Sequence, residues 1–143
     1  MSDPQHARLA ALEQAAATRI LVKDSATGTF LQSLGLTEAD YRGERFANHP
    51  RDLQGNHDLL VLTRPDAVRA LHDANLEAGS DCIETDTFTA TIIAQSDYGL
   101  DPFVREMNRE AARIARTCAD AWTARTPGKP ASSSGRSGRP TGP

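Results

Sequence analysis

The sequence predicts an α/β fold with parallel strands, and three observations lead to this prediction. Residues 20–22 form a short β-branched and apolar run that predicts a strand, and residues 82–85 predict a second strand. A turn of small polar residues follows each run. Amphipathic patterns over residues 63–78 and 103–122 lie after the first and the second run. A strand, helix, strand, helix order favours parallel strands with right-handed crossovers, so functional groups should gather where the strands end.

The first part of the chain predicts a helix that leads into the first strand. Leu9, Leu12 and Ala16 have helical spacing and precede the apolar run at 20–22. Residues 23–29 form the turn after this strand, a position that often carries function. Residues 33–58 contain three glycines and a proline with little periodicity, which indicates an elaborated loop.

The second helix has clear start and stop signals. Thr63 is the expected N-cap, and Pro65 is suited to the first turn. One apolar face follows, and Gly79 predicts a left-handed end to the helix. The face consists of Val68, Leu71, Ala74 and Ala78.

The strongest periodic signal predicts a long amphipathic helix over residues 103–122. Asp101 and Pro102 are expected to supply its cap and first turn. Four arginines fall off the apolar stripe and should face water. The stripe itself consists of Phe103, Met107, Ala111, Ile114, Cys118 and Trp122.

Residues 126–143 break this pattern, because Gly, Pro, Ser and Arg replace every large apolar residue. The direct interpretation is a partial domain at 1–125 followed by a disordered tail.

A more specific hypothesis is that a frameshift in the gene produced this tail. Loss of one T from GC-rich codons for the stretch PAFVVGAVGPTNRP yields the observed residues 130–143, and the parent stretch would be a buried strand followed by a polar turn.

Composition narrows the classes of function. The fractions of hydrophobic residues (38%) and charged residues (24%) indicate one ordinary globular domain. The net charge of -3, with scattered Lys and Arg, argues against nucleic acid as a partner. A spanning helix would need roughly 18 unbroken apolar residues, and the chain has neither such a run nor a secretory signal at its start. We therefore expect a cytoplasmic protein that does not bind membranes.

Candidate metal ligands are few. Cys82 and Cys118 are not spaced as a metal pair, and we interpret both as buried thiols. His49, His57 and His72 have no partner at metal-ligand spacing, which favours surface or capping roles.

Four segments in order then carry a resemblance to a known family. They are TEADYRGERF (37–46), DLQGNHDLLVL (52–62), ETDTF (84–88) and CADAWT (118–123). Together they resemble the N-terminal homocysteine-binding domain of cobalamin-dependent methionine synthase, over residues 20–130. The first two look like the cobalamin-dependent class rather than the betaine-dependent or plant-type homocysteine methyltransferases.

The resemblance implies a TIM (β/α)8 barrel of about 250 residues, of which this chain would be an N-terminal fragment with the first two strand-helix units. In the family, zinc held by cysteines activates the thiol of homocysteine, which takes a methyl group from methylcobalamin to give methionine. The family's cysteine ligands would lie beyond this chain, and so would the cobalamin and methyltetrahydrofolate domains. We therefore expect no catalytic or metal-ligating residue here, no bound cofactor, and no activity of the chain alone.

Two other interpretations remain open. The chain could be a non-catalytic barrel fragment that docks on a separately encoded remainder. It could also be an unrelated small α/β binding module, in which case the Gly-Pro-Ser tail would be a genuine terminus.

The resemblance also implies three substrate-binding residues. Asp24 matches the acidic residue expected to hold the homocysteine amino group, although it could instead cap a solvated turn. Glu84 would orient the substrate or make a structural hydrogen bond. Asp86 replaces the family's usual Asn with an acceptor-only carboxylate, which would repel a substrate carboxylate. Ser25 and Ala26 replace glycines that usually follow the first acidic residue, so a close backbone approach there is not expected.

Overall fold

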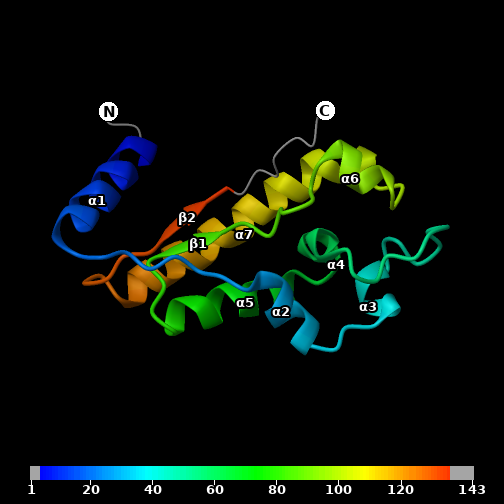
Figure 1. Ribbon diagram of the computed structural model, residues 1–143, viewed down its shortest axis with the longest axis horizontal. Coiled ribbons are helices and arrows are strands. Elements are labelled where there is room, and N and C mark those ends of the chain that lie inside the picture. The colour runs from blue at the N-terminus through cyan, green and yellow to red at the C-terminus, as the bar shows by residue number, and fades with distance from the viewer. Residues whose placement is uncertain (1–3, 136–143) are drawn as a thin grey trace.

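The computed structural model describes residues 4–135 and has a mixed α/β fold that is rich in helix (Figure 1). The elements, in chain order, are α1 (Pro4–Thr18), α2 (Thr27–Ser33), α3 (Glu38–Arg42), η1 (His57–Leu59), α4 (Leu60–Thr63), α5 (Pro65–Glu77), β1 (Cys82–Glu84), α6 (Ile92–Ser96), η2 (Asp101–Phe103), α7 (Val104–Arg125) and β2 (Ser132–Ser134).

The sheet is short and parallel. β1 pairs with β2, and Cys82 lies opposite Ser132 in the register. On the other edge of β1, Lys23 forms an isolated parallel bridge to Cys82. The helix α5 precedes β1, and α7 connects β1 to β2, so the predicted alternation of parallel extended segments and helices is confirmed.

The predicted strand at residues 20–22 is wrong in its extent. Only Lys23 bridges to β1, while the Val22 carbonyl accepts the backbone N–H of Cys82 at 3.1 Å. Ile20 is 88% exposed and Val22 is 51% exposed. Because a single residue of this segment, Lys23, forms a bridge to β1, the segment is extended without completing a strand.

The two main helices follow the predicted pattern, but their caps differ from it. α5 begins at Pro65, and Gly79 has a φ of +111°, as predicted for the helix end. Thr63 is not the cap, because it closes α4 and its hydroxyl donates to the Leu59 carbonyl at 3.5 Å. Asp101 and Pro102 lie in η2, so α7 starts at Val104.

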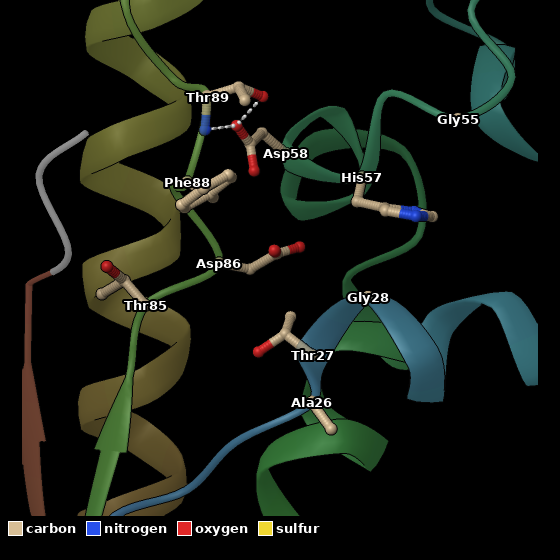
Figure 2. A pocket seen from close by; sticks show the side chains of 10 residues that line it. All are labelled: Ala26, Thr27, Gly28, Gly55, His57, Asp58, Thr85, Asp86, Phe88 and Thr89. Atoms are coloured by element: carbon tan, nitrogen blue, oxygen red, sulfur yellow. Dashed lines mark hydrogen bonds between the residues drawn. The ribbon is translucent and has the colours of Figure 1, made fainter. Parts of the chain in front are cut away.

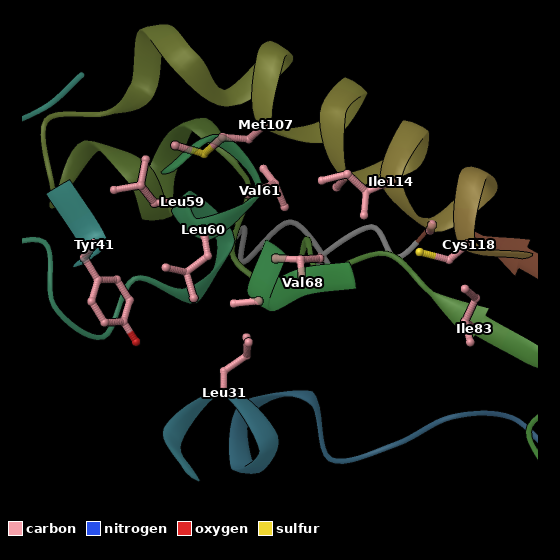
Figure 3. Packing of buried hydrophobic residues seen from close by; sticks show 14 of the residues in the cluster. Leu31, Tyr41, Leu59, Leu60, Val61, Val68, Ile83, Met107, Ile114 and Cys118 are labelled. Atoms are coloured by element: carbon pink, nitrogen blue, oxygen red, sulfur yellow. The ribbon is translucent and has the colours of Figure 1, made fainter. Parts of the chain in front are cut away.

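The core lies where α7 packs against α5, α4 and β1 (Figure 3). The predicted α7 stripe is confirmed, since four of its residues are buried and the other two are partly buried against the core. The buried four are Met107, Ala111, Ile114 and Cys118. Apolar residues of α4 and α5, such as Leu60 and Val68, complete this core from the opposite side.

The first helix is held differently. α1 forms as predicted but contains no buried residue, and Leu9 is 54% exposed. An ion pair fixes the chain just after the C-terminal end of α1. Arg19 Nη1 and Nη2 donate to the buried Asp81 carboxylate at 2.9 and 2.7 Å. The same carboxylate accepts the Val22 backbone N–H at 2.9 Å. A bidentate ion pair therefore anchors the chain leaving α1.

The prediction of a disordered tail from residue 126 is wrong for residues 132–134, which form β2. The approach to β2 is held by hydrogen bonds, from Lys129 Nζ to the Gly79 carbonyl at 2.7 Å and from the Ala131 N–H to Thr123 Oγ1 at 3.0 Å. Backbone pairing thus orders a segment whose serines offer little apolar surface. The rest of the predicted tail, residues 136–143, lies outside the described residues.

His72 is also placed differently from the prediction. Its side chain on α5 is fully buried, and within residues 4–135 neither ring nitrogen has a hydrogen-bond partner. Burial lowers the pKa of His72 from 6.5 to about 4. A buried neutral imidazole replaces the predicted surface or capping role.

None of the described helices combines the length and apolar character needed to cross a bilayer.

Protonation of His72 should make stability depend on pH. The unfolded chain takes up the proton near pH 6.5 and the folded chain only near pH 4, so the stabilisation present above 6.5 is lost as pH falls toward 4. We expect a loss of about 3 kcal/mol in the free energy of unfolding between pH 7 and pH 4 from this group. Urea denaturation of His72→Leu should lack this slope. The exposed His6→Leu variant is the control and should keep it, and a slope unchanged in His72→Leu would contradict the assignment.

Candidate functional site

A cavity of about 310 Å³ lies beyond the ends of the extended segments, and this volume is at the lower end of the range for small-molecule sites (Figure 2). Three parts of the chain line it. They are the start of α2, the segment that runs from Gly55 into η1, and the loop after β1. The lining residues are Ala26, Thr27, Gly28, Gly55, His57, Asp58, Thr85, Asp86, Phe88 and Thr89. The two polar turns predicted to carry function therefore meet at one site.

Two buried polar contacts hold the loops of this site together. Asp58 Oδ2 accepts both the backbone N–H and the hydroxyl of Thr89, each at 2.6 Å (Figure 2). The amides of Asn56 and Gln95 pair reciprocally, at 2.8 and 3.2 Å. Both amides are almost fully buried, so the pair satisfies polar groups that water cannot reach.

The long loop before the site is ordered by one ion pair on α3. The Glu38 carboxylate accepts the backbone N–H groups of Leu53 and Gln54 at 2.8 and 2.6 Å. Arg42 pairs with Glu38 at 2.7 Å and also donates to the His49 carbonyl at 2.6 Å. These contacts fix the path of the chain up to Gly55, where φ is +91°.

Three titratable side chains in or beside the cavity, those of Asp58, His57 and Tyr41, have shifted pKa values. Burial raises the pKa of Asp58, against the opposing effect of its hydrogen bonds to Thr89. Burial lowers the pKa of His57, although the neighbouring Asp58 carboxylate acts in the other direction. Tyr41 shares a 2.9 Å hydrogen bond with Nδ1 of His57, and burial raises the pKa of its hydroxyl. At neutral pH these shifts favour a neutral imidazole beside a neutral phenol.

The structure separates the three predicted substrate-binding residues. Asp86 lines the cavity and is buried. Asp24 is buried and is not among the lining residues, and its Oδ2 accepts the Glu84 backbone N–H at 3.0 Å. Glu84 forms an ion pair with Lys23 at 3.0 Å. Asp24 and Glu84 are thus neighbours, while Asp86 is the member of the set in contact with the cavity.

Sequence reasoning missed two cavity residues, His57 and Asp58. His57 was predicted to have a surface or capping role, but it is half-buried in the cavity wall. A signal was available, because both residues belong to the segment 52–62 that contributed to the family resemblance. That segment also places an acidic residue directly before an apolar run, which is unusual unless the carboxylate is hydrogen-bonded.

The described residues do not fit a zinc site. Within residues 4–135 no three His, Cys, Asp or Glu side chains are grouped closely enough to hold a metal. Cys118 is buried in the core, where burial raises the pKa of its thiol to about 11, and burial also raises the pKa of the half-buried Cys82. Neutral thiols of this kind are poor metal ligands. The prediction that both are buried thiols is confirmed for Cys118.

Comparison with solved structures supports the fold. The chain is similar to the homocysteine methyltransferase MmuM from Escherichia coli in its metallated form, with a TM-score of 0.68 and 21% identity over 89% of this chain and 41% of the other. The oxidized form of MmuM matches with a TM-score of 0.62 and 22% identity, over 81% and 36%. The chain therefore spans about two fifths of the length of these structures.

Comparison with families of sequences gives the broader assignment. The family model described as homocysteine S-methyltransferase matches residues 21–140, which is most of the chain and includes all three lining segments of the cavity. The chain belongs to the homocysteine S-methyltransferase family.

Proposed function

We propose that this chain forms the first part of a (β/α)8 barrel and contributes the amino-acid-binding wall of a cytoplasmic methionine synthase. In the complete enzyme, homocysteine bound to zinc would receive a methyl group from methylcobalamin. Within residues 4–135 no group of His, Cys, Asp and Glu side chains could hold the zinc ion. The part proposed for this chain is to bind and orient homocysteine, and we expect it to be inactive without the rest of the barrel.

The cavity after β1 is the observation that carries this proposal. It brings a buried acidic residue, Asp86, together with hydroxyl groups and the aromatic ring of Phe88. Homocysteine has an ammonium group, a carboxylate and an apolar thioalkyl chain, so a small site with these groups matches its chemistry. Membership of the family supports homocysteine as the amino acid.

Within this proposal the three acidic residues have different roles. Asp86 binds the substrate ammonium directly, since a buried carboxylate favours a cationic partner. Asp24 and Glu84 contribute negative charge near the end of β1, and Asp24 also fixes the backbone of the strand end through the Glu84 N–H. Their side chains would contact homocysteine once the site is complete.

Binding of homocysteine to the purified chain tests this function. We expect saturable binding by isothermal titration calorimetry under reducing conditions, and at least a tenfold loss in Asp86→Ala, because a charge-assisted hydrogen bond contributes about 1.5–3 kcal/mol. Asp97→Ala removes an exposed carboxylate at the end of α6 and should bind normally. Absence of saturable binding by the unmodified chain would overturn the proposal.

A second candidate function is docking on a separately encoded remainder of the barrel. The exposed Ile20 and Val22 favour it, because they present apolar side chains along the open edge beside β1. Co-expression with the downstream reading frame that carries the family's cysteines should then give a co-purifying complex containing stoichiometric zinc. Ile20→Lys should abolish that complex, whereas Ile93→Lys, an exposed position on α6, should not. Failure of the unmodified chains to co-purify would exclude this role.

A further inference from the structure

Within residues 4–135 the sheet ends at β2, whose paired side faces β1. The Ser132 N–H donates to the Asp81 carbonyl at 2.8 Å, and the Ser134 carbonyl accepts the Thr85 N–H at 3.0 Å. Backbone groups of successive residues alternate in direction along a strand, so the N–H and carbonyl of Ser133 face the other side. This side of β2 is an edge to which a further strand can be added.

A groove of about 640 Å³ lies along this edge, between α1 and α7. Figure 1 shows α1 on the side of β2 that faces away from β1. α1 contributes Leu9 and Leu12 to the wall of the groove, yet it buries no residue, and Leu9 is 54% exposed. The ion pair between Arg19 and Asp81 fixes the chain just after α1. α1 is therefore anchored at one end, and its apolar side chains beside the groove are incompletely packed.

The topology of the sheet limits what can fill this groove. α5 leads from the extended segment at Lys23 to β1, α7 leads from β1 to β2, and both helices contact β1. Right-handed crossovers place such helices on one face of a parallel sheet. A strand added beside β2 would therefore be reached through a helix that lies on this face next to α7. The groove occupies that position, with α1 as its far wall.

The charges around the groove indicate which helix would fit. The charged residues of its lining are Arg8 on α1 and Arg113 and Arg116 on α7. Arg116 pairs with Asp120 at 2.7 Å, and Arg113 pairs with Glu110 at 2.7 Å, but neither carboxylate belongs to the lining. Three arginines beside two carboxylates leave the groove positively charged, which favours a partner with acidic side chains.

We propose that this groove and the edge of β2 form a docking surface for the separately encoded remainder of the barrel. The remainder inserts an amphipathic helix with acidic flanking residues between α1 and α7, and its first strand pairs with the backbone of Ser133. The inference rests on the docking role proposed above. It adds a second contact surface, at the opposite edge of the sheet from Ile20 and Val22, and it makes α1 a wall of that surface.

Ser133→Pro tests the strand contact. Proline removes the N–H that faces the open edge and leaves the hydrogen bonds of Ser132 and Ser134 to the neighbouring strand side. Surface plasmon resonance with the purified product of the downstream reading frame should show a loss of affinity of about fivefold. Ser133→Ala keeps the backbone donor and is the matched control, which should bind as the unmodified chain does.

Arg8→Glu tests the helix contact without altering the core, because α1 buries no residue. Reversal of this charge should weaken binding of the same product about threefold, and the effect should diminish as the salt concentration rises. Arg69→Glu makes the same change of charge at an exposed position on α5, away from the groove, and should leave the affinity unchanged.

Hydrogen exchange on the unmodified chain keeps the inference testable if a variant does not fold. Binding of the remainder should slow amide exchange in α1 and at Ser133. Binding with faster exchange in α1, or with full affinity in both Ser133→Pro and Arg8→Glu, would overturn the docking surface. A dimer of the chain alone that Ser133→Pro abolishes would assign the edge to a second copy and would also overturn it. Failure of the unmodified chain to bind the remainder would overturn the docking role itself, and this inference with it.

Discussion

The candidate site depends on one constraint, the need to satisfy buried polar groups on two segments that are distant in the sequence. Asn56 and Gln95 are 39 positions apart, and their amides complete each other's hydrogen bonds where water cannot. Asp58 joins the same loops through Thr89. Breaking either contact would leave a desolvated donor or acceptor, so the loops that form the cavity are held in one arrangement.

The scaffold beneath these loops is mainly helical. α7 and α5 bury one apolar stripe each and both contact β1, which lies between β2 and the extended segment at Lys23. The sheet adds little apolar surface, particularly at β2, where three serines occupy the strand. A parent sequence with apolar residues at these positions, as the frameshift hypothesis supposes, would bury more surface against α7.

The two acidic residues of the site, Asp58 and Asp86, differ in their surroundings. Asp58 is buried and hydrogen-bonded within the protein, so it supports structure, whereas Asp86 lines the cavity. Burial lowers the pKa of the half-buried His57, and its Nδ1 shares a hydrogen bond with the Tyr41 hydroxyl.

By itself the sequence determined the parallel α/β order, the two long helices, the left-handed end at Gly79 and the two polar turns that form the cavity. These features follow from periodicity and local backbone preference, which depend on residues that are close together in the sequence. Only the tertiary structure decided that the segment at 20–22 completes no strand, that Ser132–Ser134 pair with β1, and that His72 is buried while His57 lines the site. These outcomes depend on which distant groups meet, and one histidine carries no local signal that distinguishes a core position from a cavity wall.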